Sequence, residues 1–156
     1  MHEQIKIDDP RTPDVRTLLR LHLAHMQSQS PPENVFALDV SGLLDPAVTL
    51  YSCRRDGELL AIGALKDLGD RHGELKSMHT AEAARRTGVG RTMLTHLIGV
   101  ARDRRYNRLS LETGSTAGFA PARALYASAG FAVCAAFADY HPSQHSTFME
   151  LAISCS

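Results

Sequence analysis

Three arginines and two glycines lie in one short stretch of the chain, directly before an apolar helical pattern. The stretch consists of Arg85, Arg86, Thr87, Gly88, Val89, Gly90 and Arg91. The first N–H groups of a helix have no intrahelical acceptor and the helix dipole is positive there, so several amides can hold anionic oxygens together. Glycine also lets the main chain approach a bulky phosphate closely because it has no Cβ. The stretch therefore predicts a pyrophosphate-binding loop.

Two commoner nucleotide-binding loops do not fit these residues. A Walker loop needs Lys followed by Ser or Thr after its last glycine, whereas Arg91 and Thr92 follow Gly90 at too short a spacing. A dinucleotide fingerprint needs three glycines and an acidic residue about 20 residues further on. The predicted pyrophosphate loop must therefore belong to another class.

The loop resembles the acetyl-CoA loop of the GCN5-related N-acetyltransferase (GNAT) family, Gln/Arg-x-x-Gly-x-Gly/Ala. Arg85, Gly88 and Gly90 occupy its three fixed positions. Further along, residues 122–131 are similar to the family's Ala-x-x-Leu-Tyr-x-x-x-Gly-Phe, and the resemblance covers roughly residues 48–153. One position departs, because Phe119 stands where the family often has an asparagine, seven residues before Tyr126.

This resemblance implies both a fold and a function. The fold would be of the α/β (α+β) class, with a mostly antiparallel, mixed seven-stranded sheet, a central parallel pair and helices on both faces. The whole chain would form one domain. The function would be transfer of an acetyl group from acetyl-CoA, as co-substrate, to a primary amine of a small molecule or peptide by direct attack. A catalytically silent acyl-CoA sensor or interaction module on the same fold is the alternative.

Patterns in the N-terminal third predict a first strand and two helices, and the family resemblance implies that the helices lie over one end of the sheet. Residues 4–8 alternate as a first strand, and Pro13 suits the first turn of a helix over 14–29. A second short helix or irregular lid is expected over 33–44.

Strands over 47–55 and 58–65 flank Asp56-Gly57, a strong hairpin signal. A third antiparallel strand follows over 74–80 and leads to the helix over 88–103. The strand over 108–113 must run parallel to its predecessor because a helical crossover joins them. The remaining predicted elements are a helix over 119–129 and strands over 131–137 and 147–153.

Acetyl transfer to an amine requires a proton acceptor, since lysine-like amines have pKa values of about 10.4. Glu74 is the first candidate base, and Glu112 on the neighbouring strand is the second; either could act through an ordered water. Each could equally be a carboxylate paired with Lys76 or an arginine. Tyr126 resembles the family's general acid by its position in the motif. A phenol with a pKa of about 10 is protonated at pH 7 and can therefore deliver a proton. A core aromatic beside Leu125 is the alternative for Tyr126.

Regular strand alternation places Glu74, Lys76, Met78 and Thr80 on one face and His79 on the opposite face. The resemblance implies that backbone groups of Met78 and Thr80 pair with the cofactor arm as an added strand would. The full set of predicted cofactor-binding residues is Met78, His79, Thr80, Arg85, Arg86, Thr87, Gly88, Val89, Gly90, Arg91, Phe119 and Tyr126.

Composition argues against several other classes of protein. The formal net charge is 0, from 17 basic and 17 acidic residues, so a nucleic-acid partner is not expected. No signal peptide or apolar run of about 18 residues is visible, so no membrane association is expected. The cysteines, Cys53, Cys134 and Cys155, are odd in number and far apart, which favours a reducing, cytoplasmic location. The histidine pairs lack a third ligand, so no metal site is expected. A homodimer is compatible with the sequence.

Overall fold

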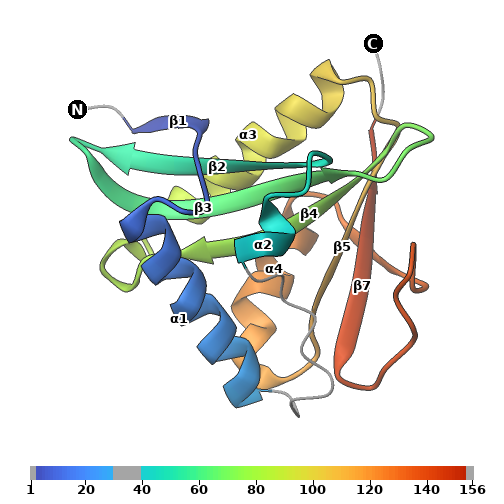
Figure 1. The fold of residues 1–156 in the computed structure, drawn as a ribbon. Helices are drawn as coiled ribbons and strands as arrows, with labels where there is room; N and C mark the ends of the chain where they lie inside the picture. The colour runs from blue at the N-terminus through green and yellow to red at the C-terminus, as the bar shows by residue number, and fades with distance from the viewer. Residues whose placement is uncertain (1–2, 30–39, 154–156) are drawn as a thin grey trace.

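A computed structural model gives the fold and describes residues 3–29 and 40–153. The chain combines strands and helices, as Figure 1 shows. In order, the elements are β1 (Gln4–Ile7), α1 (Pro13–Gln29), α2 (Val40–Leu43), β2 (Val48–Arg55), β3 (Glu58–Asp67), β4 (His72–Thr80), the 3-10 turn η2 (Glu82–Ala84), α3 (Val89–Asp103), β5 (Arg108–Gly114), the 3-10 turn η3 (Ala117–Phe119), α4 (Ala120–Ser128), β6 (Ala132–Cys134) and β7 (Ser146–Ala152).

The seven strands form one mixed sheet in the order β1-β2-β3-β4-β5-β7-β6. β4 and β5 run parallel, with α3 as the crossover between them, and every other neighbouring pair is antiparallel. The predicted sheet with its central parallel pair is therefore confirmed. At the predicted hairpin, Asp56 and Gly57 both have positive φ, 52° and 83°, as a turn between two twisted antiparallel strands requires.

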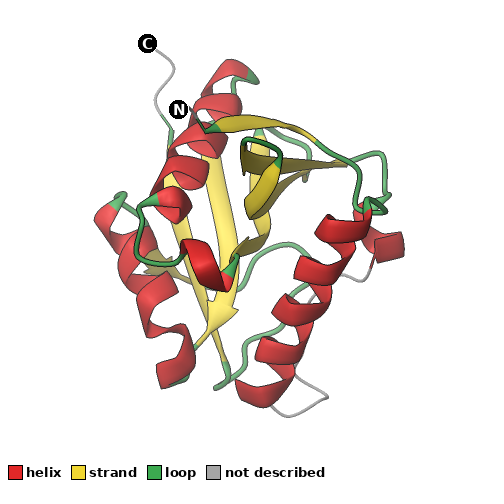
Figure 2. Ribbon diagram, turned by 90° about the vertical axis from the view of Figure 1, so that its left-hand side faces the viewer, coloured by secondary structure: helices red, strands yellow, loops and turns green. Residues whose placement is uncertain are grey.

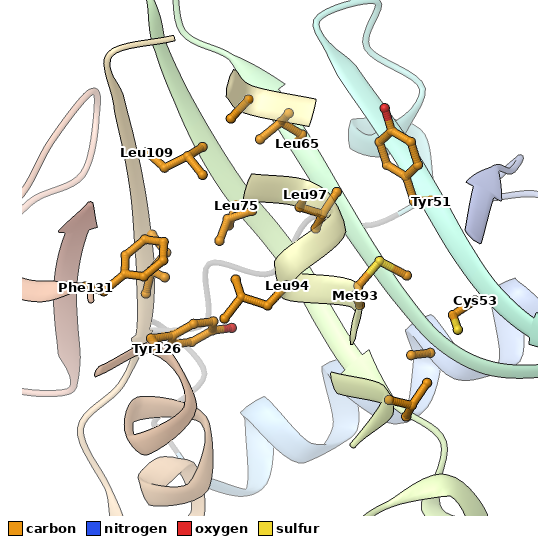
Figure 3. Packing of buried hydrophobic residues seen from close by; sticks show 14 of the residues in the cluster. Tyr51, Cys53, Leu65, Leu75, Met93, Leu94, Leu97, Leu109, Tyr126 and Phe131 are labelled. Carbon is orange, nitrogen blue, oxygen red and sulfur yellow. The ribbon is translucent and has the colours of Figure 1, made fainter. Parts of the chain in front are cut away.

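Helices cover both faces of the sheet, as Figure 2 shows. On what we call the α1 face, Val15 and Leu18 of α1 pack with Ile62 and Ala64 of β3. On the opposite α3 face, side chains of α3 and α4 join a larger core with the sheet (Figure 3). Its labelled members from α3 are Met93, Leu94 and Leu97. The apolar stripe predicted for α3 thus builds the core that fixes this helix.

Ion pairs and a hydrogen bond attach the N-terminal segment to the sheet. Arg54 of β2 binds Asp8 at 3.1 Å and Asp14, at the start of α1, at 2.6 Å. Ser52 donates its hydroxyl to Asp8 at 2.6 Å. These contacts fix where α1 begins over the sheet. Within the described residues, none of the helices is long and apolar enough to cross a membrane.

One predicted strand differs from the structure in length, and one predicted helix is described only in part. The strand predicted over 131–137 is wrong in length, because β6 pairs with β7 only over Ala132–Cys134. β6 is an edge strand whose Val133 is 73% exposed. Phe137 instead packs against Tyr140 and Phe148, with ring centroids 5.1 and 5.9 Å apart. Of the helix predicted over 33–44, the described part is α2, and the segment before residue 40 lies outside the described residues.

Two substitutions on α3 should change stability in opposite directions. Leu97→Ala removes a fully buried side chain, so we expect the free energy of unfolding to fall by about 2–5 kcal/mol. Gly99→Ala adds a Cβ that meets no atom within 4 Å, so we expect a gain of about 0.4–1 kcal/mol through the lower entropy of the unfolded chain. Urea denaturation followed by circular dichroism measures both, and equal effects of the two variants would contradict this account of the core.

Candidate functional site

The pairing between β4 and β5 stops before either strand ends. Their register runs from His72↔Arg108 to Leu75↔Leu111, whereas β4 continues to Thr80 and β5 to Gly114. We call the stretch beyond this last pair the β4–β5 opening. A cavity of about 690 Å³ occupies it, and its lining includes the start of α3, the side of α4 and residues from both strands. Most of the residues that the sequence predicts for the site line this one cavity.

The predicted pyrophosphate loop lies at one end of the cavity. Gly88 precedes α3 with φ at +87°, a conformation that favours glycine. The backbone N–H of Thr92 donates to Gly88 O at 3.0 Å, so the N–H groups of the first turn before Thr92 have no acceptor within the helix. Thr87 closes the loop by donating its hydroxyl to Ala84 O.

Gly90 contributes space to the cavity rather than an unusual backbone conformation. A Cβ at this position would lie 3.4 Å from Thr80 Oγ1 and 3.7 Å from Leu125 Cδ2. Both of those residues line the cavity on either side of the helix start. The loop, the end of β4 and α4 therefore meet around Gly90.

A β-bulge in β4 overturns the predicted alternation of its side chains. Lys76 pairs with Ala64 of β3, but His79 pairs with Ile62, so Ser77 and Met78 together oppose one residue, Gly63. Ser77 has a positive φ of 54°. His79 therefore lies on the α1 face together with Lys76 and Glu74.

The same bulge turns Met78 and Thr80 to the α3 face, so their predicted placement beside Glu74 is wrong. Met78 packs close to Gly63 on the side of α3, and Thr80 lies close to Gly90 of α3. The backbone of Thr80 has a second consequence. Ala81 donates its N–H to Leu60 O of β3 at 2.8 Å, so by alternation the N–H and C=O of Thr80 point away from β3, toward the opening.

Glu74 is buried in an ion pair on the α1 face. Its Oε2 accepts hydrogen bonds from Lys76 Nζ at 2.8 Å and from the Tyr140 hydroxyl at 2.5 Å. Lys76 Nζ also donates to the Tyr140 hydroxyl at 2.8 Å. The exposed fractions of the Glu74 and Lys76 side chains are 4% and 9%. The pairing with Lys76 that the sequence left open is therefore present, but it is buried.

Glu112, the second predicted base, lies across the opening on β5 and lines the same cavity. Its side chain is half-buried, and this burial raises the pKa of its carboxyl group above the ordinary value. Removing water disfavours the ionised form, which makes a carboxylate a stronger proton acceptor.

Tyr126 enters the cavity from α4 on the α3 face. It is 6% exposed, packs in the core, and its ring meets Phe131 with centroids 5.8 Å apart (Figure 3). Burial raises the pKa of its hydroxyl above the usual value of 10. Phe119 is also buried and lines the cavity, packed so tightly on Gly114 that a Cβ there would lie 2.1 Å from its ring. The position that departs from the family motif thus forms an apolar wall.

Tyr140 and His22 complete the cavity wall, although no motif in the sequence identifies a role for either. Tyr140 lies in the connection after β6, and His22 lies on α1. Each reaches the site from a segment far away in the chain. In the predicted helix over 14–29, His22 falls on the same helical stripe as Val15, Leu18 and Leu19, and this spacing is the signal in the sequence for its inward position.

A larger, shallower hollow lies elsewhere, between β1, α2 and the start of α1. Its charged side chains include Asp8, Asp14 and Arg54, which are already bound to one another. None of the site residues predicted from the sequence lines it. The β4–β5 opening is therefore the candidate site.

Comparison with known proteins agrees with this geometry. Residues 13–131 match the model of the acetyltransferase (GNAT) family. The chain is 49% identical over 149 residues to an Escherichia coli K12 protein named "Uncharacterized N-acetyltransferase YedL", covering 96% of this chain and 94% of that one. It is 48% identical over 145 residues to a Bacillus subtilis 168 protein named "Uncharacterized N-acetyltransferase YsnE", covering 93% and 96%.

Solved structures show the same fold. One from Klebsiella pneumoniae, whose name places it among the acyl-CoA N-acyltransferases, superposes with a TM-score of 0.83 at 28% identity and covers 97% of this chain and 98% of its own. A Bacillus subtilis acetyltransferase in complex with CoA has a TM-score of 0.75 at 16% identity, covering 98% and 100%. The match of the family model, the two relatives of nearly equal length and the shared fold lead to one conclusion: the chain belongs to the GNAT family of acetyltransferases.

Proposed function

We propose that this protein transfers the acetyl group of acetyl-CoA to a primary amine of a small molecule or a peptide. The observation that carries the proposal is the cavity in the β4–β5 opening, because one continuous lining includes the start of α3, the end of β4 and Tyr126. Family membership supports acyl transfer, and the residues of this cavity supply the groups that acetyl transfer needs.

The cofactor would lie along the opening with its pyrophosphate at α3. The amides from Arg86 to Arg91 precede the first intrahelical hydrogen bond of α3, so they can donate to phosphate oxygens. The Thr80 N–H and C=O face the opening and can pair with the amides of the cofactor arm. Phe119 contributes an apolar wall, where the family motif often has an amide side chain.

Transfer proceeds by attack of the neutral amine on the thioester carbonyl, with formation of a C–N bond and loss of the C–S bond. The departing thiolate needs a proton, and Tyr126 is the proposed donor. Burial raises the pKa of Tyr126, and it would also raise the pKa of a thiol leaving in the same buried space. The phenol therefore keeps its proton at neutral pH until negative charge develops on sulfur.

Glu74 and Glu112 supply negative charge on the side from which the amine would approach. Each can take the proton of the amine, directly or through water, or stabilise a neighbouring cation that takes it. Their charge also favours an acceptor that arrives as an ammonium ion. The Glu74–Lys76 pair holds one of these charges in a fixed position.

Narrowing the cavity at the start of α3 should weaken cofactor binding. Gly90→Val adds a branched side chain whose Cβ would lie 3.4 Å from Thr80 Oγ1 and 3.7 Å from Leu125 Cδ2, so we expect the Kd for CoA, measured by calorimetry, to rise about tenfold or more. Gly99→Ala on the same helix is the matched control and should keep the affinity of the unaltered chain. Unchanged affinity of the Gly90 variant would place the pyrophosphate elsewhere.

Acetyl transfer itself can be measured as thiol release from acetyl-CoA with a panel of polyamines, arylalkylamines, amino acids and short peptides. We expect at least one amine to be acetylated and Tyr126→Phe to lower kcat with it about 100-fold. Binding of CoA to this variant should stay within twofold, because the phenyl ring keeps its packing.

Tyr51→Phe is the control for that measurement, since Tyr51 is a buried tyrosine of the same core. Its kcat should be unchanged. A chain that binds CoA but acetylates no amine would instead support the silent acyl-CoA-binding module.

Substitutions in the Glu74–Lys76 pair can distinguish its contribution to stability from its contribution to turnover. Glu74→Gln leaves the Lys76 ammonium buried without its carboxylate, so we expect a loss of about 3–5 kcal/mol in unfolding free energy together with lower kcat. The double variant Glu74→Gln/Lys76→Met should regain stability but not turnover. Recovery of turnover in the double variant would show that Glu74 serves folding alone.

A further inference from the structure

Two histidines from distant parts of the chain meet on the α1 face of the cavity. Nδ1 of His22, on α1, lies 3.2 Å from Nδ1 of His79, on β4, and the ring centroids are 5.0 Å apart. Both side chains line the cavity in the β4–β5 opening. When one ring carries its proton on Nδ1, it donates to the Nδ1 of the other, which fixes opposite tautomers in the two rings.

The β4 bulge is what brings His79 to this position. In a regular strand His79 would lie on the α3 face, but the insertion at Ser77 pairs it with Ile62 and turns it to the α1 face. A non-glycine residue at φ +54° costs free energy that the surrounding structure must offset. The bulge therefore holds an imidazole beside the β4–β5 opening, between the backbone groups of Met78 and Thr80 that are predicted to pair with the cofactor arm.

Two carboxylate groups lie on the same face of the sheet as the two histidines. Among the described residues that line the cavity, the titratable and charged groups on the α1 face are Glu74 and Lys76 from β4, Glu112 from β5 and Tyr140 from the connection after β6. Glu74 Oε2 already accepts two hydrogen bonds, from Lys76 and Tyr140. Because Lys76 and Tyr140 already occupy this oxygen, Glu74 is less suited than His79 to take the proton of the amine.

Resting on the acetyl transfer proposed above, we propose that His79 takes the proton from the attacking amine and that His22 is its positioning partner. As the C–N bond forms and the C–S bond breaks, the amine N–H bond breaks and its electron pair stays on the amide nitrogen. The proton passes to Nε2 of His79, whose Nδ1–H donates to His22 Nδ1. Tyr126 gives its proton to the thiolate and regains one from the imidazolium through solvent.

The positions of Tyr126 and His79 agree with their proposed roles as proton donor and proton acceptor. Tyr126 enters from the α3 face and His79 lies on the α1 face, and the opening between β4 and β5 joins the two sides. The acceptor would thus arrive from the α1 face while the thiol leaves beside α4. Proton removal and proton delivery then occur at opposite ends of the tetrahedral intermediate.

The test compares His79→Gln and His22→Gln with the unaltered chain, using the best amine from the panel. We expect His79→Gln to lower kcat about 100-fold or more and to abolish the acid limb of the pH profile of kcat/KM. His22→Gln should lower kcat about tenfold and move that limb to lower pH, because the imidazolium loses its hydrogen-bond acceptor. CoA affinity and the melting temperature should change little in both variants.

His96→Gln is the matched control, since His96 lies on α3 against Tyr51, away from the proposed acceptor side. Its kcat should stay within twofold. An unaltered kcat and acid limb in His79→Gln, with the native chain active, would overturn the role of His79 and leave acetyl transfer standing. A native chain that acetylates no amine would overturn both.

The hydrogen bond between His22 and His79 can also be measured without an activity assay. Long-range ¹H–¹⁵N spectra of the unmodified protein should show one of the two Nδ1 atoms protonated and the other not at neutral pH. Assignment comes from the two glutamine variants. Two rings that both carry their proton on Nε2 would show that the hydrogen bond does not exist, and the proposal would fall.

Discussion

The early end of the β4–β5 pairing is the constraint on which the site depends. Parallel strands joined by a helix are normally paired along their length, yet these two separate after Leu75 and Leu111. Backbone groups beyond that point, such as those of Thr80, face a cavity instead of a neighbouring strand. Buried N–H and C=O groups need partners, so the opening is suited to a ligand that carries its own amides. The α3 crossover that makes the strands parallel also delivers its N-terminus to the same place.

The β4 bulge determines which side chains of β4 lie on each face of the sheet. Before Ser77, Glu74 and Lys76 lie on the α1 face; after it, His79 shares that face while Met78 and Thr80 turn to α3. One inserted residue thereby changes which side chains line the cavity on the α1 face and which lie beside the glycine loop before α3. Without it, His79 would lie among the apolar side chains of the α3 core, and the contact with His22 could not form.

Buried charge on the α1 face is held by contacts between two distant segments of the chain. Glu74 and Lys76 come from β4, and the Tyr140 hydroxyl binds both from the connection after β6. Phe137 leaves the sheet to pack against Tyr140, which keeps this hydroxyl in position. The short edge strand β6 and the fixed carboxylate are thus two results of the same packing.

Local pattern in the sequence was sufficient for the strand order around the hairpin, the helix after the glycine loop and the parallel pair, because each follows from short-range periodicity and chain connectivity. The predicted loop and Tyr126 could be singled out because the residues of each family motif lie close together in the sequence. Tertiary structure alone decided the face of His79, the partners of Glu74 and the approach of His22 and Tyr140. A bulge changes the parity of a strand without changing its composition, and contacts between residues 57 or 66 positions apart leave no local signal. The pairing of strands and the packing of helices on them determine both.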